Sequence, residues 1–103
     1  MRVNLKNPIL GLDGLPVLHN DGRPIIAGKE IAVYLYNLSS LKGAVLTPEQ
    51  KYRAYTLCMR IGCNPEDLEL TTEEACLIKD VCFEKMSAGA YGQIVDMIEN
   101  NIQ

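Results

Sequence analysis

The spacing of apolar residues along the chain changes near residue 27. Before this point, short apolar segments alternate with turn signals, and Asp13-Gly14-Leu15-Pro16 recurs eight residues later as Asp21-Gly22-Arg23-Pro24. Asp-Gly is a strong turn signal because glycine accepts the positive φ that hairpin turns require. The pattern predicts a short β-hairpin or meander in residues 1–26. Such a ribbon is unstable alone, so we expect it to pack on a helical layer.

The segment 27–40 is ambiguous in secondary structure. Residues 31–36 are apolar on all sides, a pattern typical of either a buried helix or a central strand, and periodicity cannot separate the two. We expect a helix here and keep a strand as the open alternative.

Two later helix starts are marked by capping boxes. Thr47 is followed by Pro48 and Gln50, and Thr71 is followed by Glu74 at the same spacing. In this motif the threonine side chain and the side chain three residues later satisfy each other's backbone amides, and proline suits the first helical position. We therefore predict helices over residues 47–61, with Gly62 as the C-cap, and over residues 72–86.

The last segment carries apolar residues at helical spacing, which predicts a helix over residues 88–100. Gly89 and Gly92 lie in its first turn, where each costs about 1 kcal/mol relative to alanine. We expect close packing against a neighbour as the reason for these glycines. The apolar stripe either closes the core of the monomer or buries against a second copy in a homodimer. The candidate self-association residues are Tyr91, Ile94, Ile98 and Ile102.

Taken together, these elements predict an α+β fold, an N-terminal short β-hairpin or meander packed on a bundle of three to four helices. A chain of 103 residues has the length of one domain. We expect a single domain over residues 1–103, with a β-ribbon region at 1–26 and a helical region at 27–103.

Charge and hydropathy narrow the function classes. The net charge is −3, with ten scattered basic residues, whereas nucleic-acid binding needs clustered Lys and Arg. We therefore expect no direct contact with nucleic acid. The longest apolar stretch, residues 31–36, is too short to cross a membrane, and the first residues lack the apolar region of a signal peptide. A cytoplasmic location is expected.

The four cysteines, Cys58, Cys63, Cys76 and Cys82, raise the question of a metal site. They form no C-x2-C pair and the only histidine, His19, is distant in the sequence, so the pattern does not match a zinc site. Disulfides are disfavoured by the cytoplasmic expectation. We expect Cys58, Cys76 and Cys82 to act as small core side chains, with no metal and no cofactor.

Recognisable catalytic sets are absent from the sequence. There is no Ser-His-Asp arrangement, no Gly-rich phosphate loop and no H-E-x-x-H helix. We therefore predict a protein that is not an enzyme, and surplus tyrosines suggest that some lie at the surface as contact residues. An acidic segment is the candidate partner-binding surface, with a merely solvated loop as the alternative. Its residues are Glu66, Asp67, Leu68, Glu69, Glu73 and Glu74.

Several short motifs in fixed order resemble small, largely uncharacterised proteins encoded by tailed bacteriophages and prophages. The motifs are Leu12-Asp13-Gly14-x-Pro16, Asp21-Gly22-x-Pro24, Lys51-x-Arg53-Ala54, Glu69-Leu70-Thr71-x-Glu73-Glu74-x-x-x-Ile78-Lys79 and Gly92-Gln93-Ile94-Val95. The resemblance implies a phage origin, expression in the cytoplasm of a bacterial host and a role through protein contacts.

Three functions remain open at this point. The first is a small phage effector that binds and inhibits or redirects a host protein, including a defence nuclease. The second is an accessory protein of virion assembly, with a phage protein as its partner. The third, which the missing catalytic sets disfavour, is a small enzyme or ligand binder.

Overall fold

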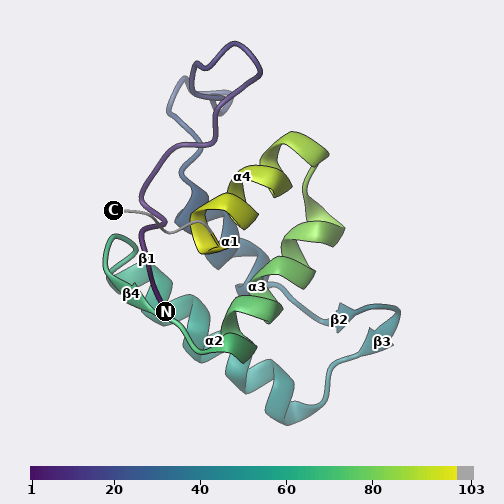
Figure 1. The fold of residues 1–103 in the computed structure, drawn as a ribbon. Coiled ribbons are helices and arrows are strands. Elements are labelled where there is room, and N and C mark those ends of the chain that lie inside the picture. Colours follow the sequence, from purple (N-terminus) through teal and green to yellow (C-terminus); the bar gives the residue numbers. More distant parts are fainter. Residues whose placement is uncertain (100–103) are drawn as a thin grey trace.

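The computed structural model describes residues 1–99 and has the predicted α+β architecture (Figure 1). Four helices form the body, and short antiparallel strands and a looped N-terminal segment lie around it. In chain order the elements are β1 (Arg2–Val3), α1 (Ala27–Tyr36), β2 (Ser40–Leu41), β3 (Ala44–Val45), α2 (Pro48–Cys63), β4 (Leu68–Glu69), α3 (Thr72–Lys85) and α4 (Ala88–Glu99).

Both predicted capping boxes are formed. The backbone amide of Gln50 donates to Oγ1 of Thr47 at 3.2 Å, and that of Glu74 donates to Oγ1 of Thr71 at 3.1 Å. Each reciprocal bond is also present, at 2.8 and 2.9 Å. The prediction that α2 stops at Gly62 is wrong, because the helix runs to Cys63 with Asn64 as C-cap. Asn64 precedes a proline, which disfavours further helical backbone.

The ambiguous segment begins with helix α1, so the helix prediction is confirmed for residues 27–36 and the strand alternative is wrong. Residues 40–45 form a hairpin, β2–β3, that the sequence analysis did not predict. Its turn places Lys42 at φ 53° and Gly43 at φ 78°, as a tight two-residue hairpin turn requires. The amide of Lys42 donates to the Glu84 carboxylate of α3 at 2.7 Å, which anchors the hairpin to the helical body.

The core lies between the four helices and the β1–β4 pair. Strand β1 pairs with β4 in antiparallel register, Val3 opposite Leu68, and both side chains are buried. Within residues 1–99 every buried side chain of the core is apolar or a cysteine. The largest buried side chains are Leu5, Ile31, Leu35, Leu57, Ile61, Leu70, Ile78, Ile94 and Ile98.

Residues 7–27 form a closed ring of three sequence repeats, called the N-terminal ring below. The repeats begin at Pro8, Pro16 and Pro24. Single antiparallel bridges join Leu10 to Pro16, Leu18 to Pro24 and Ile26 back to Pro8. In Figure 1 the ring is the purple and blue part of the chain that projects beyond the helices at the top.

A cycle of backbone hydrogen bonds closes this ring. The amide of Val17 donates to the carbonyl of Ile9, that of Ile25 to Val17, and that of Ile9 to Ile25, at 2.8 to 2.9 Å. Because each segment bonds to both of the others, the ring has no free end strand of the kind that recruits further strands. The sequence analysis identified two Asp-Gly-x-Pro repeats and missed the first proline, Pro8, whose eight-residue spacing was the available signal.

The two Asp-Gly turns have the predicted conformation. Gly14 and Gly22 have φ of 81° and 86°. Oδ1 of Asp13 accepts the amide of Leu15, and Oδ1 of Asp21 accepts that of Arg23, each at 3.0 Å. These local bonds hold the first two turns. The third repeat has no such turn, because the chain runs from Ile26 directly into α1.

Candidate functional site

The acidic candidate residues are neutralised by basic groups of the same chain. All five carboxylates form ion pairs: Glu66 with Lys6, Asp67 with Arg2, Glu69 with Arg2 and the amino group of Met1, Glu73 with Arg53, and Glu74 with Arg60. Leu68, by contrast, is buried in the core, so it is not a surface contact. This neutralisation could not be read from the sequence, because the cations come from residues 1–6 and from α2.

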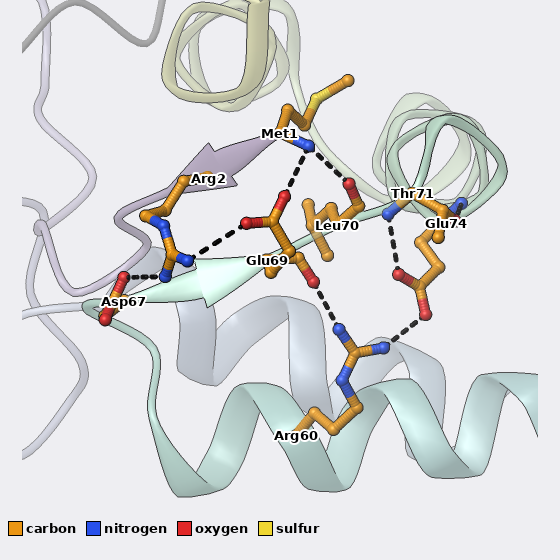
Figure 2. Close-up of polar contacts among 8 residues, drawn as sticks. All are labelled: Met1, Arg2, Arg60, Asp67, Glu69, Leu70, Thr71 and Glu74. Atoms are coloured by element: carbon orange, nitrogen blue, oxygen red, sulfur yellow. Dashed lines mark hydrogen bonds and ion pairs between the residues drawn. The ribbon is translucent and has the colours of Figure 1, made fainter.

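Figure 2 shows how this network holds β1, β4 and the start of α3 together. The amino group of Met1 donates to Glu69 at 2.8 Å and to the carbonyl of Leu70 at 2.7 Å. This amino group, and after it Arg2, lower the pKa of the Glu69 carboxyl below its ordinary value. Arg60 donates to the carbonyl of Glu69 and to Glu74. The arrangement supports the fold, and a basic partner would have to displace these cations.

Reversing the charge of Asp67 is therefore expected to destabilise the protein. In Asp67→Lys an ammonium would replace the carboxylate that lies 2.6 Å from Arg2, and like charges repel. Because both groups are exposed, the effect should shrink in about 1 M salt, where screening acts within a few ångströms. Thermal unfolding at low and high salt measures this. An unchanged midpoint at low salt would contradict a structural role for the pair.

The candidate self-association stripe lies mostly in the core of the monomer. Ile94 and Ile98 are buried, so they are not available to a second copy. Tyr91 is half-buried and its ring packs edge-on against Phe83, with centroids 5.6 Å apart. Ile102 lies outside the described residues. Ile94 and Ile98 therefore close the core of the monomer and do not form a dimer contact.

The predicted close packing at Gly89 and Gly92 is wrong. A Cβ placed on either glycine would lie within 4 Å of no atom of another element in residues 1–99. Both positions face open space along α4, so the reason for glycine here is not a neighbouring element of the monomer.

The cysteine predictions are partly confirmed. Cys58 and Cys82 are buried, as expected, but Cys76 is exposed, as is Cys63. Cys76 lies two positions before the buried Ile78, and two positions turn a helix by about 200°, so it faces away from the core. Within residues 1–99, no group of three or more metal-binding side chains is arranged to hold an ion.

Exposed apolar side chains gather instead on the N-terminal ring. Elsewhere among the described residues they are spread over Met1, α1, β3, α2 and α3, and tyrosines 36, 52 and 55 are exposed as the sequence suggested. The exposed apolar residues of the ring are Leu10, Leu12, Leu15, Val17 and Leu18.

Leu10, Leu18 and Ile26 are equivalent positions of the three repeats, and only at Leu18 is the backbone left without a bond to a helix within residues 1–99. The amide and carbonyl of Leu10 are both bonded by the side chain of Gln93 in α4, at 2.8 and 2.7 Å. Ile26, one repeat length further than Leu18, leads into α1 and its carbonyl accepts the amide of Glu30. Within residues 1–99, the backbone of Leu18 forms no such bond, and its side chain is 54% exposed. The sequence analysis did not identify the role of Gln93, which depends on packing across 83 positions of the chain.

A groove of about 410 Å³ lies between the ring, α1 and the turn from α3 to α4. We call it the ring groove. Its walls carry two charged side chains, Glu30 and Lys85, and neither forms an ion pair within residues 1–99. Oε2 of Glu30 accepts the hydroxyl of Tyr34 at 3.3 Å. The apolar lining residues are Ile9, Leu10, Leu12, Val17, Ile25, Met86 and Ala90.

A second cavity, of about 300 Å³, lies between the β2–β3 hairpin and helices α2 and α3. Its charged rim differs from that of the ring groove, because Arg53 pairs with Glu49 and Glu73, and Glu74 pairs with Arg60. The unpaired charges therefore distinguish the ring groove from this cavity.

Comparison with protein families, with curated proteins and with solved structures finds no match in any of the three. Among the described residues, none of the helices combines the length and the apolar character needed to cross a membrane.

Proposed function

We propose that this protein is a non-catalytic binding protein whose protein partner docks on the exposed apolar surface of the N-terminal ring. The observation that carries the proposal is the uncovered second repeat. Its equivalents at Leu10 and Ile26 are bonded by α4 and α1, whereas Leu18 is open.

Two features of this surface indicate that it binds a partner. Large exposed apolar patches are typical of interaction sites, and the short ring segment carries five exposed apolar side chains. Closure of the ring also holds them on a hydrogen-bonded backbone, which lowers the entropy cost of binding.

The role of such a binder follows the resemblance of the sequence to phage-encoded proteins. We propose a cytoplasmic phage effector that binds and inhibits a host protein. An accessory role in virion assembly is the second candidate, and its partner would be a phage protein. Burial of Ile94 and Ile98 leaves little of the α4 stripe to support a homodimer.

A capture experiment tests the ring as the binding surface. We expect the double variant Leu15→Asp/Leu18→Asp to lose the partner that the wild-type protein captures from bacterial lysate, because charged groups would have to be desolvated at the contact. Both positions are exposed, so the fold should be retained.

Val45→Asp is the matched control, because Val45 is a 79% exposed apolar residue on β3, outside the ring. It should capture the partner as the wild type does. A partner retained by the ring variant would contradict the proposal. Capture from uninfected cells supports the effector role, whereas capture of a phage protein only after infection supports assembly.

A further inference from the structure

We propose that the ring groove binds an amphipathic helix of the partner, apolar face inward, with a basic side chain against Glu30 and an acidic one against Lys85. This inference rests on the proposed function and names the chemistry of the partner segment.

At the groove, the ring backbone is already hydrogen-bonded, which disfavours an added strand there and favours a helix. An extended peptide binds by pairing its backbone with an exposed sheet edge. Here the amides of Ile9, Val17 and Ile25 are bonded within the ring, and the groove-lining Leu10 is bonded by Gln93. A segment that enters the groove must therefore satisfy its own backbone, as a helix does.

The lining of the groove matches one face of such a helix. Ring residues such as Leu10 and Val17 form one wall, and Met86, just after α3, and Ala90 of α4 form another. Apolar side chains at positions i, i+3, i+4 and i+7 of a helix make a stripe of the kind that lies in apolar grooves.

The two charges set the polarity of the partner. Glu30 is half-buried on α1; within residues 1–99 its carboxylate accepts the hydroxyl of Tyr34 and forms no ion pair with a cation. Lys85 at the end of α3 is exposed, and it pairs with no anion of the described residues. A helix that carries Lys or Arg at one place and Asp or Glu at another complements both groups, and charge complementarity selects partners and orients them.

The test uses two displayed peptide libraries against the immobilised full chain. One contains alanine-based helices of about 15 residues, long enough to be partly helical alone, with one face randomised. The other contains linear peptides interrupted by proline, which cannot form a continuous helix. We expect enrichment from the helical library only, with an apolar stripe and a basic residue in the selected peptides.

Two glycine variants then locate the binding site. Gly89 lines the groove and Gly92 does not, yet an added Cβ meets no atom at either position. Gly89→Leu should fill the groove and weaken the selected peptides about tenfold or more, whereas Gly92→Leu should stay within about twofold of wild type. Equal thermal unfolding of the two variants excludes an effect through folding.

Charge exchange tests the polarity. Glu30→Lys should weaken peptides that carry a basic residue, and changing that residue to glutamate should restore binding. Enrichment only of proline-containing peptides, enrichment from neither library, or equal binding by Gly89→Leu and wild type would each overturn the inference. If the Leu15→Asp/Leu18→Asp variant fails to capture the partner from lysate but Gly89→Leu still captures it, the proposed function holds and the ring groove is not the site of the partner helix.

Discussion

Replacing Gly28 by alanine is expected to lower the free energy of unfolding by about 1–3 kcal/mol, the usual cost of overpacking. A Cβ on Gly28 would lie 2.9 Å from the carbonyl oxygen of Leu5 and 3.2 Å from Cβ of Pro65. The oxygen is backbone and accepts the amide of Gly28 at 2.7 Å, so it cannot rotate away. The segment that follows β1 would have to shift, and with it the buried Leu5.

Gly92→Ala is the matched control for this prediction. The same substitution on α4 meets open space, and removal of a helical glycine should raise the free energy of unfolding by about 0.4–1 kcal/mol. Urea unfolding of both variants measures the two effects. A Gly28→Ala protein as stable as Gly92→Ala would contradict the close approach of the β1 segment to α1.

The second large effect is expected at alkaline pH, where Cys82 should destabilise the fold. Burial raises the pKa of its thiol from 9.0 to about 12. Between these values the unfolded chain loses the proton while the folded chain keeps it. The stability that Cys82 contributes is therefore fully present below pH 9 and falls as pH rises, by about 1.4 kcal/mol per pH unit.

Urea unfolding from about pH 8 to about pH 11 should show this loss in the wild type and a shallower one in Cys82→Ala. Burial also raises the pKa of Cys58 and Tyr34, which act in the same direction, so only the difference in slope belongs to Cys82. The exposed Cys63 provides a control, because Cys63→Ala also removes one thiol but leaves the buried Cys82 in place. Equal slopes for wild type and Cys82→Ala would show that the thiol ionises in the folded state.

The elements that the sequence predicted well depend on neighbouring residues alone. Thr47 and Thr71 each find their capping partner three positions away, and Gly14 and Gly22 supply the positive φ of their own turns. Such signals join residues within a few positions of each other, so they can be recognised in the sequence without knowledge of the packing. Residues 27–36 carry no such local signal, since the N-cap residue Ile26 makes no side-chain capping bond. The all-apolar pattern of residues 31–36 therefore left the strand alternative open.

The candidate site was decided by contacts between distant parts of the chain. The acidic segment read as an unpaired surface, but Arg2 and Arg60 reach it from other elements. The sequence showed two repeated turns of the ring, but closure of the ring requires Pro8 to meet Ile26, and its attachment to α4 requires Gln93 to bond Leu10.

Glycines show most directly what only the tertiary structure decided. Gly28 and Gly92 both lie in the first part of a helix, and nothing in the sequence distinguishes their surroundings. Packing makes the first indispensable, because the carbonyl of Leu5 lies against it, and leaves the second open to substitution. Turns, caps and helical stripes were thus determined by the sequence itself, through interactions over a few residues. Which side chains are buried, paired or left open to a partner was decided by the tertiary structure, because those interactions join residues far apart in the chain.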